Sequence, residues 1–339
     1  NITWERAKTF DAGFDLNLKN GLGVVFDYYN SKRSDILMVR STIPTTSGFQ
    51  ADIQSNMGKA ESKGFDLALD YNKSFANTWW TQLRGNMTYA TNRLLTNEEP
   101  NYPANLSYLT HLGYPIKQQY GLIAERLFVD DIEADNSPLQ NFGGALKTMG
   151  GDIKYRDING DGKITDLDKV PIGFPTDPEI IYGMGFTVGF KGFDVSAFLQ
   201  GSARSSFFIN PGNITPFAIN GPYQNGLLKQ VADSHWSEDN QDIRAFWPRL
   251  TDGFNNNNNQ FSTWWMRNGA FLRLKSVELG YTVPKKVLDR WKMSNIRIYT
   301  NALNLAVWSK FKMWDPEMGG DGLGYPVQAV YNIGINVGL

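Results

Sequence analysis

The last nine residues of the chain, Tyr331 to Leu339, alternate strictly between two kinds of side chain. The odd-numbered positions are apolar, and the even-numbered positions are Asn or Gly. A period of two is expected of a β-strand, whose successive side chains point to opposite faces. One face seeks an apolar phase, while the other is too polar and too small to build the second layer of a sandwich core. Such a strand, repeated around a closed sheet, is typical of a transmembrane β-barrel.

Eight further segments show the same alternation, and most pair into hairpins along the chain. Asn20-Gly21 is a tight-turn signal between the first two segments. The apolar phase slips between Leu274 and Val277, which predicts a β-bulge. Including the terminal segment, the expected strands are residues 9–18, 22–28, 65–72, 79–89, 182–190, 193–199, 271–281, 296–307 and 331–339.

Short turns and long loops alternate between these strands. Outer-membrane barrels have the same asymmetry, with short turns on the periplasmic side and long loops outside the cell. Bacterial single-chain barrels also have an even number of strands. The predicted fold class is therefore all-β: a transmembrane antiparallel β-barrel, of which residues 1–339 are the C-terminal section, about nine strands of a larger domain. The chain is expected to start just after an extracellular loop.

Composition removes several other classes of protein. The 339 residues contain no apolar stretch of 18 or more, so a membrane-spanning helix is not expected. A net charge of -1 gives no support to nucleic-acid binding, which needs a basic surface. Cysteine is absent, and His111 and His235 lie far apart without companions, so neither a zinc site nor a Ser/His/Asp triad is indicated. No feature of the sequence predicts an enzyme.

The apolar row of each strand is the predicted membrane face. Aromatic residues near several strand ends suit the interfacial girdle of such barrels. A soluble all-β protein with ordinary aromatic packing is the alternative. The predicted lipid-facing residues are Phe10, Phe14, Leu16, Leu67, Leu69, Met184, Phe186, Val188, Ile333, Ile335 and Val337.

A series of short phrases, in the same order along the whole chain, resembles the SusC/RagA family of TonB-dependent outer-membrane transporters of Bacteroidota. Each phrase alone is weak, but their order is specific. Thr3 stands where the family's first phrase has a basic residue, and Leu339 stands where many outer-membrane proteins end in an aromatic one. The phrases are Trp4-Glu5, residues 27–37, 44–49, 56–66, 151–157, 271–284, 301–305 and 315–317.

This resemblance implies a barrel of about 22 strands with a plugged lumen. It also implies energy supplied through the TonB complex, and a SusD-like surface lipoprotein as a lid. Nothing in this stretch resembles a plug domain or a TonB box, which lie N-terminal in the family. The implied location is the outer membrane of a Gram-negative, Bacteroidota-type bacterium.

The sharpest local motif is the segment Asp157 to Asp168, DINGDGKITDLD. Its oxygen-bearing side chains at positions 1, 3, 5 and 12, with glycine at position 6 and a backbone carbonyl at position 7, match the spacing of a calcium loop. The alternative is a loop held by side-chain to backbone hydrogen bonds. The predicted structural calcium ligands are Asp157, Asn159, Asp161, the Lys163 carbonyl and Asp168.

Four tryptophans fall in or beside the long loop at 207–265: Trp236, Trp247, Trp264 and Trp265. If exposed, they could stack on sugar rings or grip a peptide. Packing of the loop against its neighbours is the alternative.

The first functional hypothesis is a section of a SusC-like transporter that imports glycans or peptides with a SusD-like lipoprotein. The alternative is a secreted, calcium-dependent carbohydrate-binding or carbohydrate-active β-protein.

Overall fold

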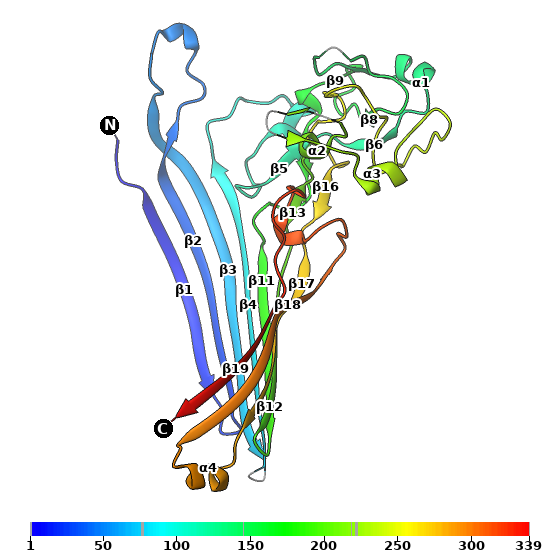
Figure 1. The fold of residues 1–339 in the computed structure, drawn as a ribbon. Helices are drawn as coiled ribbons and strands as arrows, with labels where there is room; N and C mark the ends of the chain where they lie inside the picture. The colour runs from blue at the N-terminus through cyan, green and yellow to red at the C-terminus, as the bar shows by residue number, and fades with distance from the viewer. Residues whose placement is uncertain (1, 76–77, 145, 218, 221–222, 339) are drawn as a thin grey trace.

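A computed structural model describes residues 2–75, 78–144, 146–217, 219–220 and 223–338. Within these residues, nine long strands form one antiparallel sheet in the order β1-β2-β3-β4-β11-β12-β17-β18-β19. The sheet is a curved wall with β1 and β19 at its edges, the long loops at one end and the hairpin turns at the other (Figure 1). Its strands are β1 Arg6–Asn17, β2 Leu22–Val39, β3 Gln54–Phe75, β4 Trp79–Thr96, β11 Ile180–Phe190, β12 Phe193–Ala203, β17 Phe271–Thr282, β18 Asn295–Ser309 and β19 Val330–Gly338.

Each expected strand is present, and most extend further than the alternation alone predicted. β2 continues to Val39 and β3 begins at Gln54, so the loop between them is shorter than expected. Lys73 still belongs to β3, although the expected strand ended at residue 72. Backbone pairing in these strands continues beyond the apolar segment. Outside the membrane, side chains need not alternate between apolar and polar.

The predicted turns and the predicted bulge have clear backbone causes. Gly21 has a φ of 91°, and a Cβ at this residue would lie 2.0 Å from the Asn72 carbonyl oxygen, so the position needs glycine. Lys191 and Gly192 both have positive φ, as a two-residue hairpin turn of this hand requires. The register shifts between Leu274 and Ser276, which confirms the β-bulge.

The two faces of the sheet differ across its width. Residues paired directly across antiparallel strands point to the same face. One cross-strand row from β2 to β19 is entirely apolar and contains Leu22, Tyr71, Leu83, Phe186, Ala197, Val277, Ala302 and Tyr331. The adjacent row from β3 to β19 is entirely polar and contains Asn72, Gln82, Thr187, Ser196, Glu278, Asn301 and Asn332.

The predicted membrane face is therefore one continuous surface. Of the predicted residues, Phe10, Ile333 and Ile335 have exposed fractions of 62%, 85% and 63%, which suits side chains that meet lipid rather than a protein core. Leu67 and Val188 are partly buried by their neighbours. We call this surface the apolar face and the opposite one the polar face.

Shorter elements occupy the two long insertions and the connections β2–β3, β17–β18 and β18–β19. The short strands are β5 Gln119–Gly121, β6 Ala124–Leu127, β7 Leu139–Gln140, β8 Ile153–Tyr155, β9 Lys163–Ile164, β10 Val170–Ile172, β13 Ser206–Phe208, β14 Ile219–Asn220, β15 Tyr223–Gln224 and β16 Met266–Asn268. The α-helices are α1 Asp131–Asp135, α2 Pro211–Ile214, α3 Lys229–Asp233 and α4 Lys285–Trp291. The 3-10 turns are η1 Thr45–Ser47, η2 Ala104–Leu109, η3 Asp166–Asp168 and η4 Pro316–Met318. No helix among the described residues is long and apolar enough to cross a membrane.

Candidate functional site

The two long insertions, residues 97–179 and 204–270, fold together into one compact unit at the loop end of the sheet (Figure 1). We call it the loop unit. The hydrophobic core of the chain lies mainly here rather than in the sheet, because the apolar face of the sheet has no protein layer against it. The buried core residues are Leu122, Leu127, Ile153, Tyr155, Ile164, Ile209, Ile214, Val231, Trp236, Ala245, Trp247 and Trp265, with Phe311 from the loop after β18.

The four tryptophans lie together in this unit, but mostly inside it. Trp236, Trp247 and Trp265 are only 7%, 6% and 1% exposed, and the rings of Trp247 and Trp265 are 5.2 Å apart. The Trp265 ring nitrogen donates to the Asn258 carbonyl at 2.7 Å. Trp264 is partly buried and packs against the same core. The packing alternative therefore holds for three of the four rings, which form part of the core of the loop unit. Substrate contact by the set stays a prediction.

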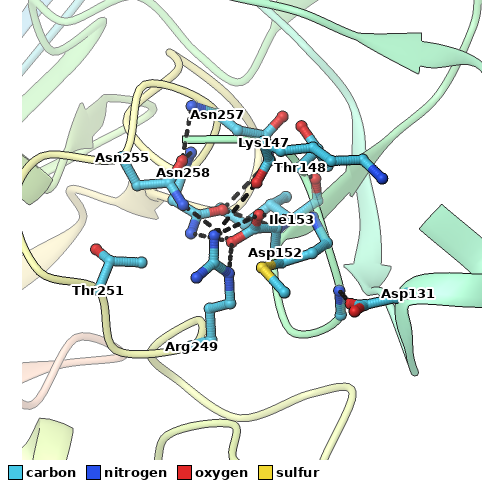
Figure 2. Close-up of polar contacts among 12 residues, drawn as sticks. Asp131, Lys147, Thr148, Asp152, Ile153, Arg249, Thr251, Asn255, Asn257 and Asn258 are labelled. Carbon is cyan, nitrogen blue, oxygen red and sulfur yellow. Dashed lines mark hydrogen bonds and ion pairs between the residues drawn. The ribbon is translucent and has the colours of Figure 1, made fainter. Parts of the chain in front are cut away.

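Asp152 joins the two insertions at the centre of the loop unit (Figure 2). Its side chain is fully buried and accepts hydrogen bonds from Arg249 Nε at 2.8 Å, Asn255 Nδ2 at 3.0 Å and Asn258 Nδ2 at 2.9 Å. Burial raises the pKa of this carboxyl, whereas the Arg249 guanidinium and the amide donors act in the opposite direction. The network fixes the second insertion onto the first.

The asparagine run, expected only as part of a loop, supplies much of this network. Asn255, Asn257 and Asn258 are each about 95% buried, and their amides bond to buried backbone groups as well as to Asp152. Asn257 Oδ1, for example, accepts from Gln140 Nε2 at 2.8 Å. The sequence alone did not indicate this role, because consecutive asparagines usually form an exposed loop. Only the tertiary contact with Asp152 shows their role.

The segment Asp157 to Asp168 forms a closed loop containing β9 and η3. Asp157 accepts hydrogen bonds from the Gly160 and Gly162 amides at 2.7 and 2.8 Å. The buried Asp168 carboxylate turns back to accept from the Ile158 and Thr165 amides, each at 2.8 Å. This is the bonding expected of the alternative, a loop held by its own side chains.

The carboxylates of this loop are not drawn together into one cluster in the structure. Among the described residues, no three His, Cys, Asp or Glu side chains gather closely enough to hold a metal ion. Each carboxylate oxygen has two lone pairs, so an oxygen with one amide donor retains acceptor capacity for an ion. The acidic and amide oxygens at 157, 159, 161 and 168 therefore fit calcium chemically, and the calcium site stays a prediction.

The loop unit also has a hollow that the sequence did not indicate. It has a volume of about 190 Å³ and is lined mainly by apolar and amide side chains, among them Phe208, Asn259, Gln260 and Trp265. Phe254 and Phe261 at its wall are 51% and 54% exposed, unlike the tryptophans. Aromatic rings beside amide groups are the surface that stacks on and hydrogen-bonds to a polar organic ligand.

Several charges on the polar face of the sheet are paired with one another. Arg297 on β18 donates to Asp194 on β12 at 2.6 Å and to Glu278 on β17 at 2.7 Å. Arg273 on β17 is 3% exposed and forms ion pairs with Asp315 and Glu317, each at 2.6 Å. The Arg273 pairs fasten the loop after β18 to the wall, whereas Arg297 links three strands within the wall.

Comparison with known proteins agrees with this architecture. Residues 1–305 match the family described as "TonB dependent receptor-like, beta-barrel". The chain belongs to this family. Similar curated proteins include TonB-dependent receptor P26 of Formosa agariphila, 27% identical over 99% of this chain and 35% of that protein, and TonB-dependent receptor SusC of Bacteroides thetaiotaomicron, 23% identical over 99% and 32%. A solved structure of the RagAB peptide transporter matches with a TM-score of 0.74 and 22% identity, covering 99% of this chain and 36% of that one.

These findings confirm the SusC/RagA resemblance, the partial β-barrel and the outer-membrane location. The family is one of transport receptors, not of enzymes. The chain spans about a third of the length of the curated relatives it matches. The exposed apolar face argues against the secreted, soluble alternative, because in such a protein side chains such as Phe10, Ile333 and Ile335 would meet water.

Proposed function

We propose that this chain is the C-terminal wall and loop region of a SusC-like transporter that imports glycans or peptides across the outer membrane. The observation that carries the proposal is the division of the sheet into a continuous apolar face and a continuous polar face, with the loop unit at one rim. The wall separates lipid from a wet lumen, and the loop unit stands where a substrate would enter.

We further propose a SusD-like surface lipoprotein as lid and the TonB complex as energy source, the latter acting through a part of the protein N-terminal to this section. Both follow from the family and from the SusC and RagAB relatives. The substrate would contact the hollow at Phe254 and Phe261, because these are the aromatic side chains that the loop unit leaves exposed at a concave surface.

The test is uptake by cells that carry the full-length protein. A panel of labelled oligosaccharides and peptides is offered, and import is expected for one class, lost when either the transporter or TonB is deleted. An affinity-tagged transporter is expected to co-purify with a surface lipoprotein. Import of every panel member that continues without TonB would refute the transport proposal.

The hollow is tested separately by replacing Phe254 and Phe261 with Ala in the full-length protein. The matched control is Phe49→Ala, since Phe49 is 64% exposed in the loop between β2 and β3. Substrate affinity is expected to fall about tenfold per lost stacking ring in the double variant and to stay unchanged in the control. Equal affinity in both would exclude the hollow as a substrate contact.

A further inference from the structure

Four basic side chains gather on the apolar face near the loop end of the sheet. Lys8, Lys32 and Arg93 belong to one cross-strand row that runs through β1, β2, β3 and β4. Lys63 on β3 lies on the same face, in the next row toward the hairpin end, because it is two residues from Glu61, the β3 member of the first row. All four basic residues are exposed.

The position of this basic cluster relative to the membrane follows from the strands that carry it. On each strand the cation lies two or four residues beyond the last aromatic residue of the apolar face, which is Phe10, Tyr28, Phe65 or Tyr89. At about 3.4 Å per residue and a tilt of about 40°, that separation is about 5–10 Å along the membrane normal. This is the depth of the lipid headgroups, just outside the hydrocarbon.

One acidic residue, Glu61, pairs with two of the four basic side chains but does not neutralise the cluster. Glu61 is 5% exposed and accepts from Arg93 Nε at 2.7 Å, and its carboxylate is 3.6 Å from Lys32 Nζ. One carboxylate among four cations leaves an excess of three positive charges. A hollow of about 390 Å³ lies between Lys8 and Lys32, with Phe10 and Tyr28 in its wall. The wall of this hollow is therefore cationic at Lys8 and Lys32 and aromatic at Phe10 and Tyr28.

We propose that Lys8, Lys32, Lys63 and Arg93 bind the phosphate of an anionic lipid headgroup in the outer leaflet. The cations point out of the barrel, toward the membrane rather than the lumen, so a transported substrate would not meet them. A free anion in solution would bind weakly at such exposed charges, whereas a lipid phosphate is held at this height by its own acyl chains. The aromatic wall of the hollow contacts the apolar part of the same lipid.

The experiment uses the full-length protein in detergent with lipid A, a phosphorylated and acylated disaccharide, as the probe. The test variant combines Lys8→Gln, Lys32→Gln and Lys63→Gln, and it leaves Arg93 in place so that Glu61 keeps its partner. The control combines Lys19→Gln, Lys73→Gln and Lys191→Gln, which removes the same charge at the hairpin end. Heat modifiability on gels confirms that both variants retain the barrel.

The test variant is expected to bind lipid A about 100-fold more weakly, because each lysine near an anionic surface contributes about a fivefold factor. The control is expected to bind like the wild type. Dephosphorylated lipid A should bind the wild type as weakly as lipid A binds the test variant, and millimolar inorganic phosphate should not displace bound lipid A. The proposal would be overturned if the test variant bound lipid A like the wild type, or if the control lost as much affinity as the test variant. It would also be overturned if the wild type bound dephosphorylated lipid A as tightly as lipid A, or if phosphate displaced bound lipid A.

Discussion

A lysine introduced at Phe186 should destabilise the protein in lipid far more than a lysine introduced at the next residue, Thr187. Phe186 lies in the apolar row between Leu83 and Ala197, while Thr187 lies in the polar row between Gln82 and Ser196. Phe186 is four residues from Phe190, whose ring stacks on Trp79 at 4.2 Å near the hairpin end. That separation corresponds to about 10 Å along the membrane normal, close to the middle of an apolar band about 25 Å tall.

The expected cost follows from this depth. A lysine on the lipid face near the midplane costs about 2–4 kcal/mol and almost nothing near the interface. Phe186→Lys should therefore lower the free energy of unfolding by about 3 kcal/mol, Val188→Lys by less, and Phe190→Lys by about 1 kcal/mol or less. Thr187→Lys should cost less than about 1 kcal/mol, because the new ammonium group faces the wet side of the wall.

The assay is urea-induced unfolding of the full-length protein from lipid vesicles, followed by tryptophan fluorescence. The decisive quantity is the difference between neighbouring residues, since a general effect of lysine on the strand would change both alike. Equal penalties at Phe186 and Thr187, or a penalty that rises from Phe186 to Phe190, would refute the assignment of the two faces.

Three other outcomes concern the loop unit. Asp152→Ala should destabilise it by about 3–5 kcal/mol, because the mostly buried Arg249 loses its carboxylate partner. Hydrogen exchange in residues 249–258 should then accelerate while exchange in the wall stays slow. The control is Asp131→Ala, which removes an exposed acidic side chain that accepts from the Gly150 amide. Burial alone would raise the pKa of Glu133, but hydrogen bonds from Arg126, Lys154 and the Val129 amide lower it to about 2. Because that pKa is depressed, the stability contributed by Glu133 is present above pH 4.5 and lost as the pH falls toward 2. Protection of the α1 amides from exchange, relative to the intrinsic exchange rate at each pH, should therefore fall in that window, and Glu133→Gln should remove this pH dependence. If the loop at 157–168 holds calcium, chelation should increase protease cleavage between residues 150 and 175 while the barrel stays intact. The double variant Asp157→Ala and Asp161→Ala should show the same increase without a chelator. Unchanged cleavage on chelation would exclude the ion.

The sheet could be predicted because membrane strands obey a strict local rule. Alternation at Phe10 to Leu16 or Ile333 to Val337 is visible without any knowledge of neighbouring strands, and Asn20-Gly21 fixes the turn geometry locally. The bulge near Lys275 was also visible, as a one-residue slip in the apolar phase. The lengths were less predictable. β2 reaches Val39 only because it pairs with β3 there, and pairing outside lipid places no demand on side-chain polarity.

The loop unit could not be predicted in the same way, because its elements are short and held by distant partners. β6 pairs with β8, and the Leu127 amide bonds to the Ile243 carbonyl in the other insertion. Tryptophan content indicated that something would pack there, but not that Trp236, Trp247 and Trp265 would be buried. Conversely, Phe254 and Phe261 carry no signal that separates them from the buried aromatics.

The wall and the loop unit are thus stabilised in different ways. The wall holds few buried apolar side chains and depends on lipid against its apolar face, whereas the loop unit excludes water from a core of its own around Trp265 and Tyr155. The link between the two includes the Thr91 hydroxyl on β4, which donates to the Glu179 carboxylate of the first insertion at 3.1 Å. Because a change in the loop unit leaves the lipid-facing row untouched, the proposed binding surface can vary without altering insertion into the membrane. A polar residue in the part of the apolar face that crosses the hydrocarbon, such as the row of Phe186, has no such freedom, since the side chains there meet lipid chains.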